Sequence, residues 1–483
     1  MNFTEYHPLN NLIQTLSDKK GSKITFEELK EELVKNDENG IPFYNLSFKE
    51  NEDLCLIYNN DHPDREPTEL EMNCRSYILD KTNLECVGTQ FNKIVYNQDA
   101  VNYINEKEKT DDQFWNNVVV QPCYEGTILL VFYHNNSWYV STRRCLSAQD
   151  SKWVRNKSYM DMFKEAIKNK FDFDDLDKNY CYTFILVHYK NKNIVNYTNL
   201  GKEYKEVFHI ITTEKYTVNE VEYEIPNISK IESLKTKGLD DLLALLNSVS
   251  NENQTKRRVT TEGFVLRVYE GEKYKSCFRI LKLQTELYQK LMRIKPNNSN
   301  IHQSYLELFQ KDKLNDFLPY FSKYNNNIVK RISNAMKTIS KEILNLYHLT
   351  RDKKNPNIYT QLGKNYKKIL FGLHGLYIEH KKKELNNKLV NDQVSNDEVS
   401  NDEVSNDEVN NTSNSNEELV DYHISKSINV NDVYYYLKSL SPYDLRQIFF
   451  ERTSMLDNDD FTFMNKKCIN TMTQSTLMFG TKD

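Results

Sequence analysis

The period of the hydrophobic pattern changes once along this chain of 483 residues, near Thr285. Before that point apolar and polar residues mostly alternate, as in 54–58 and 261–268, which is typical of strands with one buried face. After it, apolar residues recur every three or four positions from Leu287 to Tyr377, which is typical of amphipathic helices. The pattern therefore predicts an α+β fold class, with an antiparallel-sheet core followed by an all-helical C-terminal domain.

The same pattern predicts how the chain is divided. We expect an N-terminal helical and strand extension, a sheet domain, a basic helical domain, a linker and a C-terminal helical segment, over 1–50, 51–286, 287–388, 389–421 and 422–483. The linker holds ten acids, no Lys or Arg and the repeat Val-Ser-Asn-Asp-Glu, which predicts disorder. Strands are expected at 53–58, 71–80, 84–90, 91–96 and 180–187, and helices at 26–34, 158–169 and 239–249.

Basic residues dominate from 323 to 383, where 14 Lys or Arg face three acids. Interleaved Tyr and Phe would let this surface take both phosphates and bases, so it predicts RNA or another nucleic acid as the partner. The acidic linker could compete with nucleic acid for the same surface. The alternative is that the lysines only solvate the helices, and an even spread over all helix faces would favour it.

Several functional classes are excluded by composition. The eight Cys are scattered singly, no C-x-x-C occurs and His is not spaced with them as in a zinc site, which indicates a reduced, intracellular chain. The N-terminus lacks the pattern of a signal peptide, and no apolar run approaches the length of a membrane span. No membrane partner is therefore expected.

The stretch 121–127, between two strand-like runs, contains Cys123-Tyr124-Glu125-Gly126. A short acidic turn with a glycine brings backbone and carboxylate close to a ligand, and Arg143 and Arg144 end the next strand. Paired arginines favour an anionic ligand, with phosphate as the first candidate. The alternative is a plain hairpin with solvated charges.

Strand motifs follow one another over roughly residues 50–290: Cys74–Asp80 with Arg75, Phe91-Asn92-Lys93, Cys123–Gly126, Thr142–Arg144, Tyr182–Leu186 with Asn193–Val195, Glu262–Val265 and Ile280–Lys282. In order and spacing this series resembles the covalent nucleotidyltransferase superfamily, and within it the phage-type RNA ligase 1 branch. In that family a lysine attacks the α-phosphate of ATP, the AMP passes to an RNA 5′-phosphate, and a 3′-hydroxyl displaces it.

The resemblance implies ATP and Mg²⁺ as cofactors and assigns roles to matching residues. Glu262 would bind the metal, and the nucleotide would be bound by Arg75, Lys93, Glu125, Gly126, Arg143 and Lys282. Cys123 stands at the position of the family's lysine.

Three departures from the family pattern fall in this one pocket. Cys123 replaces the nucleophile, and no Lys occurs between Lys109 and Lys152. The glutamate expected on the strand of Phe184 falls at Leu186 or a neighbouring apolar residue, and Gln284 replaces the second cation of the last motif. The departures predict a pseudoenzyme that binds nucleotide or RNA but has lost lysine adenylylation. The alternative is an active, divergent ATP-dependent RNA ligase with another nucleophile, such as Lys93, a lysine of the helical domain, or a thiolate of Cys123.

The Asn-, Lys- and Tyr-rich composition and the divergent motifs resemble proteins of large DNA viruses. They predict an intracellular, cytoplasmic location, which for a viral protein is the cytoplasm of the host.

Overall fold

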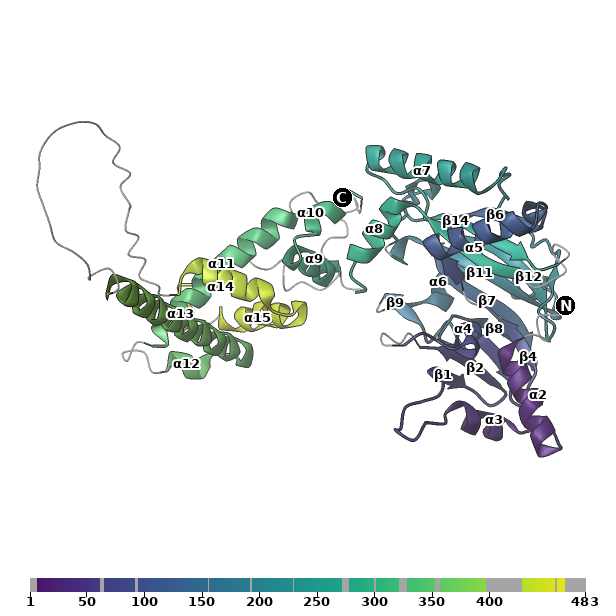
Figure 1. Cartoon of the computed structure of the whole chain (residues 1–483), viewed down its shortest axis with the longest axis horizontal. Helices are drawn as coiled ribbons and strands as arrows, with labels where there is room; N and C mark the ends of the chain where they lie inside the picture. Colours follow the sequence, from purple (N-terminus) through teal and green to yellow (C-terminus); the bar gives the residue numbers. More distant parts are fainter. Residues whose placement is uncertain are drawn as a thin grey trace, which may run out of the picture. The chain divides into compact units, whose positions relative to one another are not determined.

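The computed structural model describes residues 7–60, 65–91, 94–154, 156–191, 193–228, 230–271, 278–298, 301–320, 328–351, 357–396, 428–456 and 458–464. The chain divides into two compact units, Met1–Ile294 with Pro319–Phe321, and Lys295–Leu318 with Ser322–Asp483. The first unit holds the sheets and the second holds helices (Figure 1). The predicted α+β class is therefore confirmed. None of the described helices combines the length and the apolar character that a membrane span requires.

The smallest of the three main sheets is fully antiparallel, in the order β1 (Leu46–Glu50), β2 (Leu54–Asn59), β3 (Tyr77–Asp80) and β4 (Cys86–Thr89). Its core includes residues of α2 (Pro8–Lys20), α3 (Phe26–Leu33) and α4 (Glu69–Asn73). The prediction of one strand over 71–80 is wrong in its first half. Thr68 and Glu71 form a capping box there, which satisfies the first amides of a short helix.

The largest sheet is also antiparallel, in the order β13 (Glu220–Val221), β12 (Lys205–Glu214), β11 (Tyr180–His188), β7 (Thr127–His134) and β8 (Ser137–Ser141). Helix α6 (Tyr159–Ile167) covers one face through Met162, Phe163 and Ala166. The opposite face packs on the smallest sheet through Leu130 and Phe132. A short two-stranded ribbon, β9 (Lys152–Val154) and β10 (Lys157–Ser158), lies between β8 and α6 in the sequence.

The third sheet positions the candidate site, in the order β5 (Ile94–Tyr96), β15 (Phe278–Gln284), β14 (Gly263–Tyr269) and β6 (Val118–Cys123). Its β5 is parallel to β15 and the other pairs are antiparallel. Helices α5 (Asn97–Thr110) and α7 (Leu239–Lys256) cover one face and share a core with Val120, Leu266 and Leu283. Because strand side chains alternate, Cys123 and Lys282 lie on the face opposite these two helices. Helix α8 (Glu286–Ile294) follows β15 in the same unit.

The second unit is helical: α9 (Ile301–Gln310), α10 (Leu314–Phe317), α11 (Ile328–Leu349), α12 (Ile358–Gln361), α13 (Lys364–Asn396), α14 (Val430–Ser439), α15 (Pro442–Met455) and the 3₁₀ turn η5 (Asp459–Phe461). Helix α15 begins after Ser441, whose hydroxyl accepts a hydrogen bond from the backbone amide of Asp444. Helix α13 ends inside the segment 389–421 that was predicted to be disordered. Residues 397–427 lie outside the described part of the chain.

One buried ion pair joins α15 to α11. Arg452 donates from Nε to Oε2 of Glu342 and from Nη2 to Oε1, each at 2.6 Å, and Arg452 is only 1% exposed. Two parallel hydrogen bonds fix the planar groups against each other. The pair therefore sets the position of α15 on α11, although its net stabilisation is small because both charges are desolvated.

We predict that Arg452→Met destabilises the helical unit by about 3–5 kcal/mol, because it leaves the Glu342 carboxylate buried without its partner. Urea denaturation followed by circular dichroism measures the change. The matched variant Glu342→Leu/Arg452→Met removes both charges and should recover most of the loss. A midpoint for Arg452→Met equal to that of the wild type would contradict this role.

Candidate functional site

Cys123 is the last residue of β6 and is 7% exposed. It pairs with Gly263 of β14, which in turn pairs with Gln284 of β15. A Cβ atom on Gly263 would lie 2.0 Å from the carbonyl oxygen of Leu283, and the glycine has φ +149°. Only glycine fits there, and its small size lets β15 approach β14.

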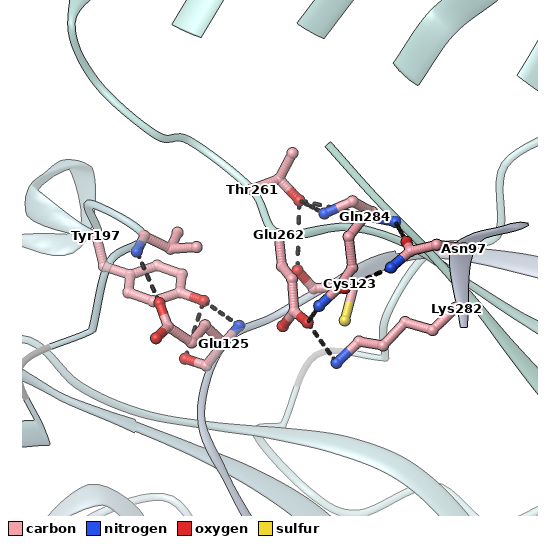
Figure 2. A network of polar contacts seen from close by, with 10 residues as sticks. Asn97, Cys123, Glu125, Tyr197, Thr261, Glu262, Lys282 and Gln284 are labelled. Carbon is pink, nitrogen blue, oxygen red and sulfur yellow. Dashed lines mark hydrogen bonds and ion pairs between the residues drawn. The ribbon is translucent and has the colours of Figure 1, made fainter. Parts of the chain in front are cut away.

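The amine of Lys282 lies next to the Cys123 thiol. Lys282 belongs to β15, and its Nζ is 2.5 Å from Oε1 of Glu262, the residue that precedes β14. The two side chains are 18% and 5% exposed. Figure 2 shows the sulfur, the ammonium and the carboxylate gathered together. The space beside the expected nucleophile position is therefore filled by an amine from another strand.

Burial fixes the protonation of this cluster. Burial raises the pKa of the Cys123 thiol to about 12; Lys282 acts in the opposite direction and Glu262 adds to the rise. Burial alone would lower the pKa of Lys282, but Cys123 and Glu262 outweigh it and hold that pKa above its usual value. At neutral pH the site therefore presents a neutral thiol and a paired ammonium, and neither form is nucleophilic.

Gln284 takes over the position of the second expected cation. Its Nε2 donates to Oε1 of Glu262 at 2.7 Å, so the amide and Lys282 share one carboxylate oxygen. Asn97 holds the amide in turn, donating from Nδ2 to Oε1 of Gln284 at 3.0 Å and accepting from the Gln284 backbone amide at 2.9 Å (Figure 2). Sequence reasoning missed Asn97, because a lone polar residue at a strand end carries no motif.

Glu125 is held by the segment 193–197. Its Oε2 accepts from the backbone amide of Val195 at 2.7 Å, and its carbonyl oxygen accepts from Asn193 Nδ2 at 2.9 Å. The Tyr197 hydroxyl accepts from the Glu125 amide at 2.6 Å and donates to the Glu125 carbonyl at 3.1 Å. One carboxylate oxygen of Glu125 is thus engaged within the protein.

Gly126 is required by the neighbouring strand β11. A Cβ atom at Gly126 would lie 2.5 Å from Ile185 Cγ2 and 2.6 Å from the carbonyl oxygen of Leu186. The sequence predicted that this glycine lets backbone approach a ligand, and the structure shows close approach to protein backbone instead.

The glutamate that the family resemblance led us to expect on the strand of Phe184 has no counterpart on β11. Leu186 is fully buried in the core shared with α6, and its neighbour Ile185 faces Gly126. Aromatic side chains lie around the turn instead: Tyr124 stacks on Phe208 with ring centroids 4.0 Å apart, which leaves no space for a base between the two rings. Tyr288 of α8 is also buried. Burial, with the Glu125 and Glu262 carboxylates adding to it, raises its pKa well above the usual value.

A second polar group lies where the smallest sheet meets β8. Arg143 donates from Nη2 to the side-chain oxygen Oδ1 of Asn59 at 3.1 Å. The backbone amide of Asn59 donates to the carbonyl of Cys74, the residue before Arg75. Arg75 is half-buried and forms no ion pair with a described residue. The described contacts do not join this group to Cys123, and Lys93 lies outside the described residues.

Buried hydroxyl groups lie near this second polar group. The Gln90 backbone amide donates to the carbonyl of Ser76, and its Nε2 donates to the carbonyl of Ser141. The hydroxyls of Ser76, Thr89 and Ser141 are buried and have no hydrogen-bond partner among the described residues. Gln90 therefore links the chain beside Arg75 to the end of β8 near Arg143, and two arginines are charges of the kind that suit a phosphate.

A magnesium ion fits the site only together with a substrate. In the part of the chain that the structure describes, no three His, Cys, Asp or Glu side chains are grouped to hold a metal. Mg²⁺ commonly binds one or two carboxylates plus substrate phosphates. Glu262 is the carboxylate that would serve, and the ion would compete for it with Lys282 and Gln284.

The thiol geometry predicts slow alkylation of Cys123. In the folded protein, iodoacetamide should modify half-buried Cys145 well before buried Cys123, as measured by peptide mass spectrometry. Because the reactive form is the thiolate and the Cys123 pKa is about 12, its rate should keep rising tenfold per pH unit to at least pH 10. In urea the two cysteines should react alike. A Cys123 rate that levels off near pH 8.5 in the folded protein would contradict the described environment.

Comparisons with known proteins find distant similarity. No protein-family model matches the chain. An immediate-early protein ICP-46 homolog of Invertebrate iridescent virus 3 is 33% identical over 86 residues, which is 17% of this chain and 19% of that protein. The homolog of the same name in Invertebrate iridescent virus 6 is 23% identical over 348 residues, 68% of this chain and 72% of that protein.

Among solved structures, a putative ATP-dependent DNA ligase from Aquifex aeolicus has a TM-score of 0.34 at 14% identity, over 57% of this chain and 67% of that chain. An archaeal ATP-dependent RNA ligase (form 1) has a TM-score of 0.34 at 10% identity, over 60% and 68%. At these identities, coverages and TM-scores the similarities do not assign the chain to a family.

Proposed function

We propose that the sheet unit is a ligase-like nucleotidyltransferase fold that binds a nucleotide or an RNA 5′-phosphate without forming a covalent bond to AMP. The observation that carries the proposal is the state of the Cys123 cluster. A buried thiol stands where the family resemblance places the lysine, and the neighbouring Lys282 amine is paired with Glu262.

Covalent transfer needs a nucleophile with a free electron pair. With a pKa of about 12, roughly one Cys123 thiol in 10⁵ is ionised at pH 7. The Lys282 amine is protonated and its proton is held by Glu262. The retained residues can therefore supply charge for binding but lack an activated group for transfer.

Binding rests on the cationic groups that remain. Arg75, Arg143 and Lys282, with Lys93 predicted from the sequence, suit the phosphates of ATP or of an RNA end. A magnesium ion would arrive with those phosphates, with Glu262 as its protein ligand, and would neutralise part of their charge. The two curated relatives are viral proteins, which supports a viral origin, and a location in the host cytoplasm is part of this proposal.

A second candidate function is that of an active, divergent ATP-dependent RNA ligase. The position of the Lys282 amine against Cys123 favours it, because the amine lies beside the expected nucleophile. If Glu262 accepted its proton, the amine could attack the α-phosphate of ATP, form a phosphoramidate and release pyrophosphate.

The proposal predicts no AMP adduct on incubation with α-labelled ATP and Mg²⁺, as read on a denaturing gel. Equilibrium binding of ATP, or of a 5′-phosphorylated oligonucleotide, should nevertheless be measurable. Arg75→Gln should weaken it about 10- to 100-fold, the loss expected for one charge-assisted hydrogen bond. Arg257→Gln, which removes the same charge from an exposed residue at the end of α7, is the matched control and should change little.

The variants separate the outcomes. An adduct that disappears in Lys282→Met but persists in Cys123→Ala would establish the second candidate. An adduct that requires Cys123 would show a reactive thiol. Absence of binding to either ligand would contradict both functions.

A further inference from the structure

Helix α11 carries one continuous exposed face of polar and basic residues. Its members recur at spacings of three and four, and we refer to them as the α11 stripe: Lys330, Asn334, Lys337, Lys341, Asn345 and His348. At 3.6 residues per turn these positions lie on one side of the helix. The opposite side is buried through Ile332, Met336, Ile339 and Ile343.

The stripe is positively charged and free of acids. The one acidic residue of α11 is Glu342, which is buried and bound to Arg452. Exposed lysines elsewhere in the chain often pair with carboxylates, as Lys20 does with Glu28. The three lysines of the stripe form no ion pair with a described residue, so their charge is available to a partner.

A hollow of about 340 Å³ lies beside the C-terminal half of the stripe. Lys341, Asn345 and His348 line it together with Leu344, Glu342 and Phe463, which follows η5. The volume falls at the lower end of the range of small-ligand pockets, about 300–1,000 Å³. An aromatic ring, an amide, an imidazole and an ammonium thus line one open hollow, together with Leu344 and with Glu342, whose carboxylate is bound to Arg452.

We infer that the α11 stripe binds single-stranded nucleic acid and that the hollow receives one of its bases. Lys337 and Lys341 are one helical turn apart, about 6 Å along the axis, so they can contact neighbouring phosphates of one strand. The Phe463 ring offers a stacking surface, and Asn345 and His348 offer donors and acceptors to a base edge.

The hollow favours a single strand, because the bases of a duplex are stacked and paired and are not free to enter it. This inference extends the proposed function but does not rest on it, because the stripe belongs to the helical unit and uses none of the residues around Cys123.

The test uses the full chain and fluorescence anisotropy with a labelled 12-nucleotide RNA, the same sequence as DNA, and its duplex. Lys337→Gln/Lys341→Gln should weaken binding of both single strands about 10- to 60-fold at 50 mM salt. It should also reduce the slope of log affinity against log salt by about 1.4, at about 0.7 per lost phosphate contact. The matched control Lys19→Gln/Lys23→Gln removes two exposed charges from around the end of α2 and should leave both values unchanged.

A separate substitution tests the role of the hollow. Phe463→Ala should weaken binding roughly 5- to 100-fold, the range for loss of one stacked base, with the salt slope unchanged. Thermal unfolding of each variant checks folding, and ATP binding measured on the same samples reports separately on the sheet unit.

Tighter binding of the duplex than of both single strands would overturn the inference. So would an affinity and salt slope for Lys337→Gln/Lys341→Gln that match the control.

Discussion

The ion pair between Lys282 and Glu262 is the interaction on which the candidate site depends. It fills the space beside Cys123 with a protonated amine and engages the one carboxylate suited to a metal, so it decides which chemistry remains. The pair exists because three strands bring their ends together, and Gly263 lets β15 approach β14. Gln284 donates to the same carboxylate, and Asn97 holds Gln284 in place (Figure 2). The arrangement is a closed hydrogen-bonded network, and an incoming phosphate would have to open it.

The sequence predicted most of the sheets and the later helices, because their periods are strong. The alternation of apolar and polar residues over 261–268 predicted β14, and the strand predicted at 180–187 is present as β11. Helix α5 was missed because its 14 residues bury only Ala100 and Ile104, too few to establish a period. The first half of 71–80 was mistaken for a strand because a short capped helix of five residues has almost no periodic signal.

The site could be predicted residue by residue but not in its contacts. The motifs placed Cys123, Glu262 and Lys282 on neighbouring strands, yet their meeting depends on strand register, which one sequence does not specify. Gly126 was predicted to let the backbone approach a ligand, and the close neighbours that require a glycine there are Ile185 and the Leu186 carbonyl of β11. On α11, Lys330, Lys337 and Lys341 share one face that has no acid, which composition alone could not distinguish from an even spread.

The central claim is that the sheet unit keeps a nucleotide-binding surface and lacks an activated nucleophile. Intact-protein mass spectrometry after incubation with ATP and Mg²⁺, at several pH values between 6 and 9, tests it most directly. We predict an unchanged protein mass throughout, because Cys123 stays a thiol and Lys282 stays paired with Glu262 over this range. A mass increase of one AMP, located by peptide mapping at Lys282 or Cys123, would contradict the account.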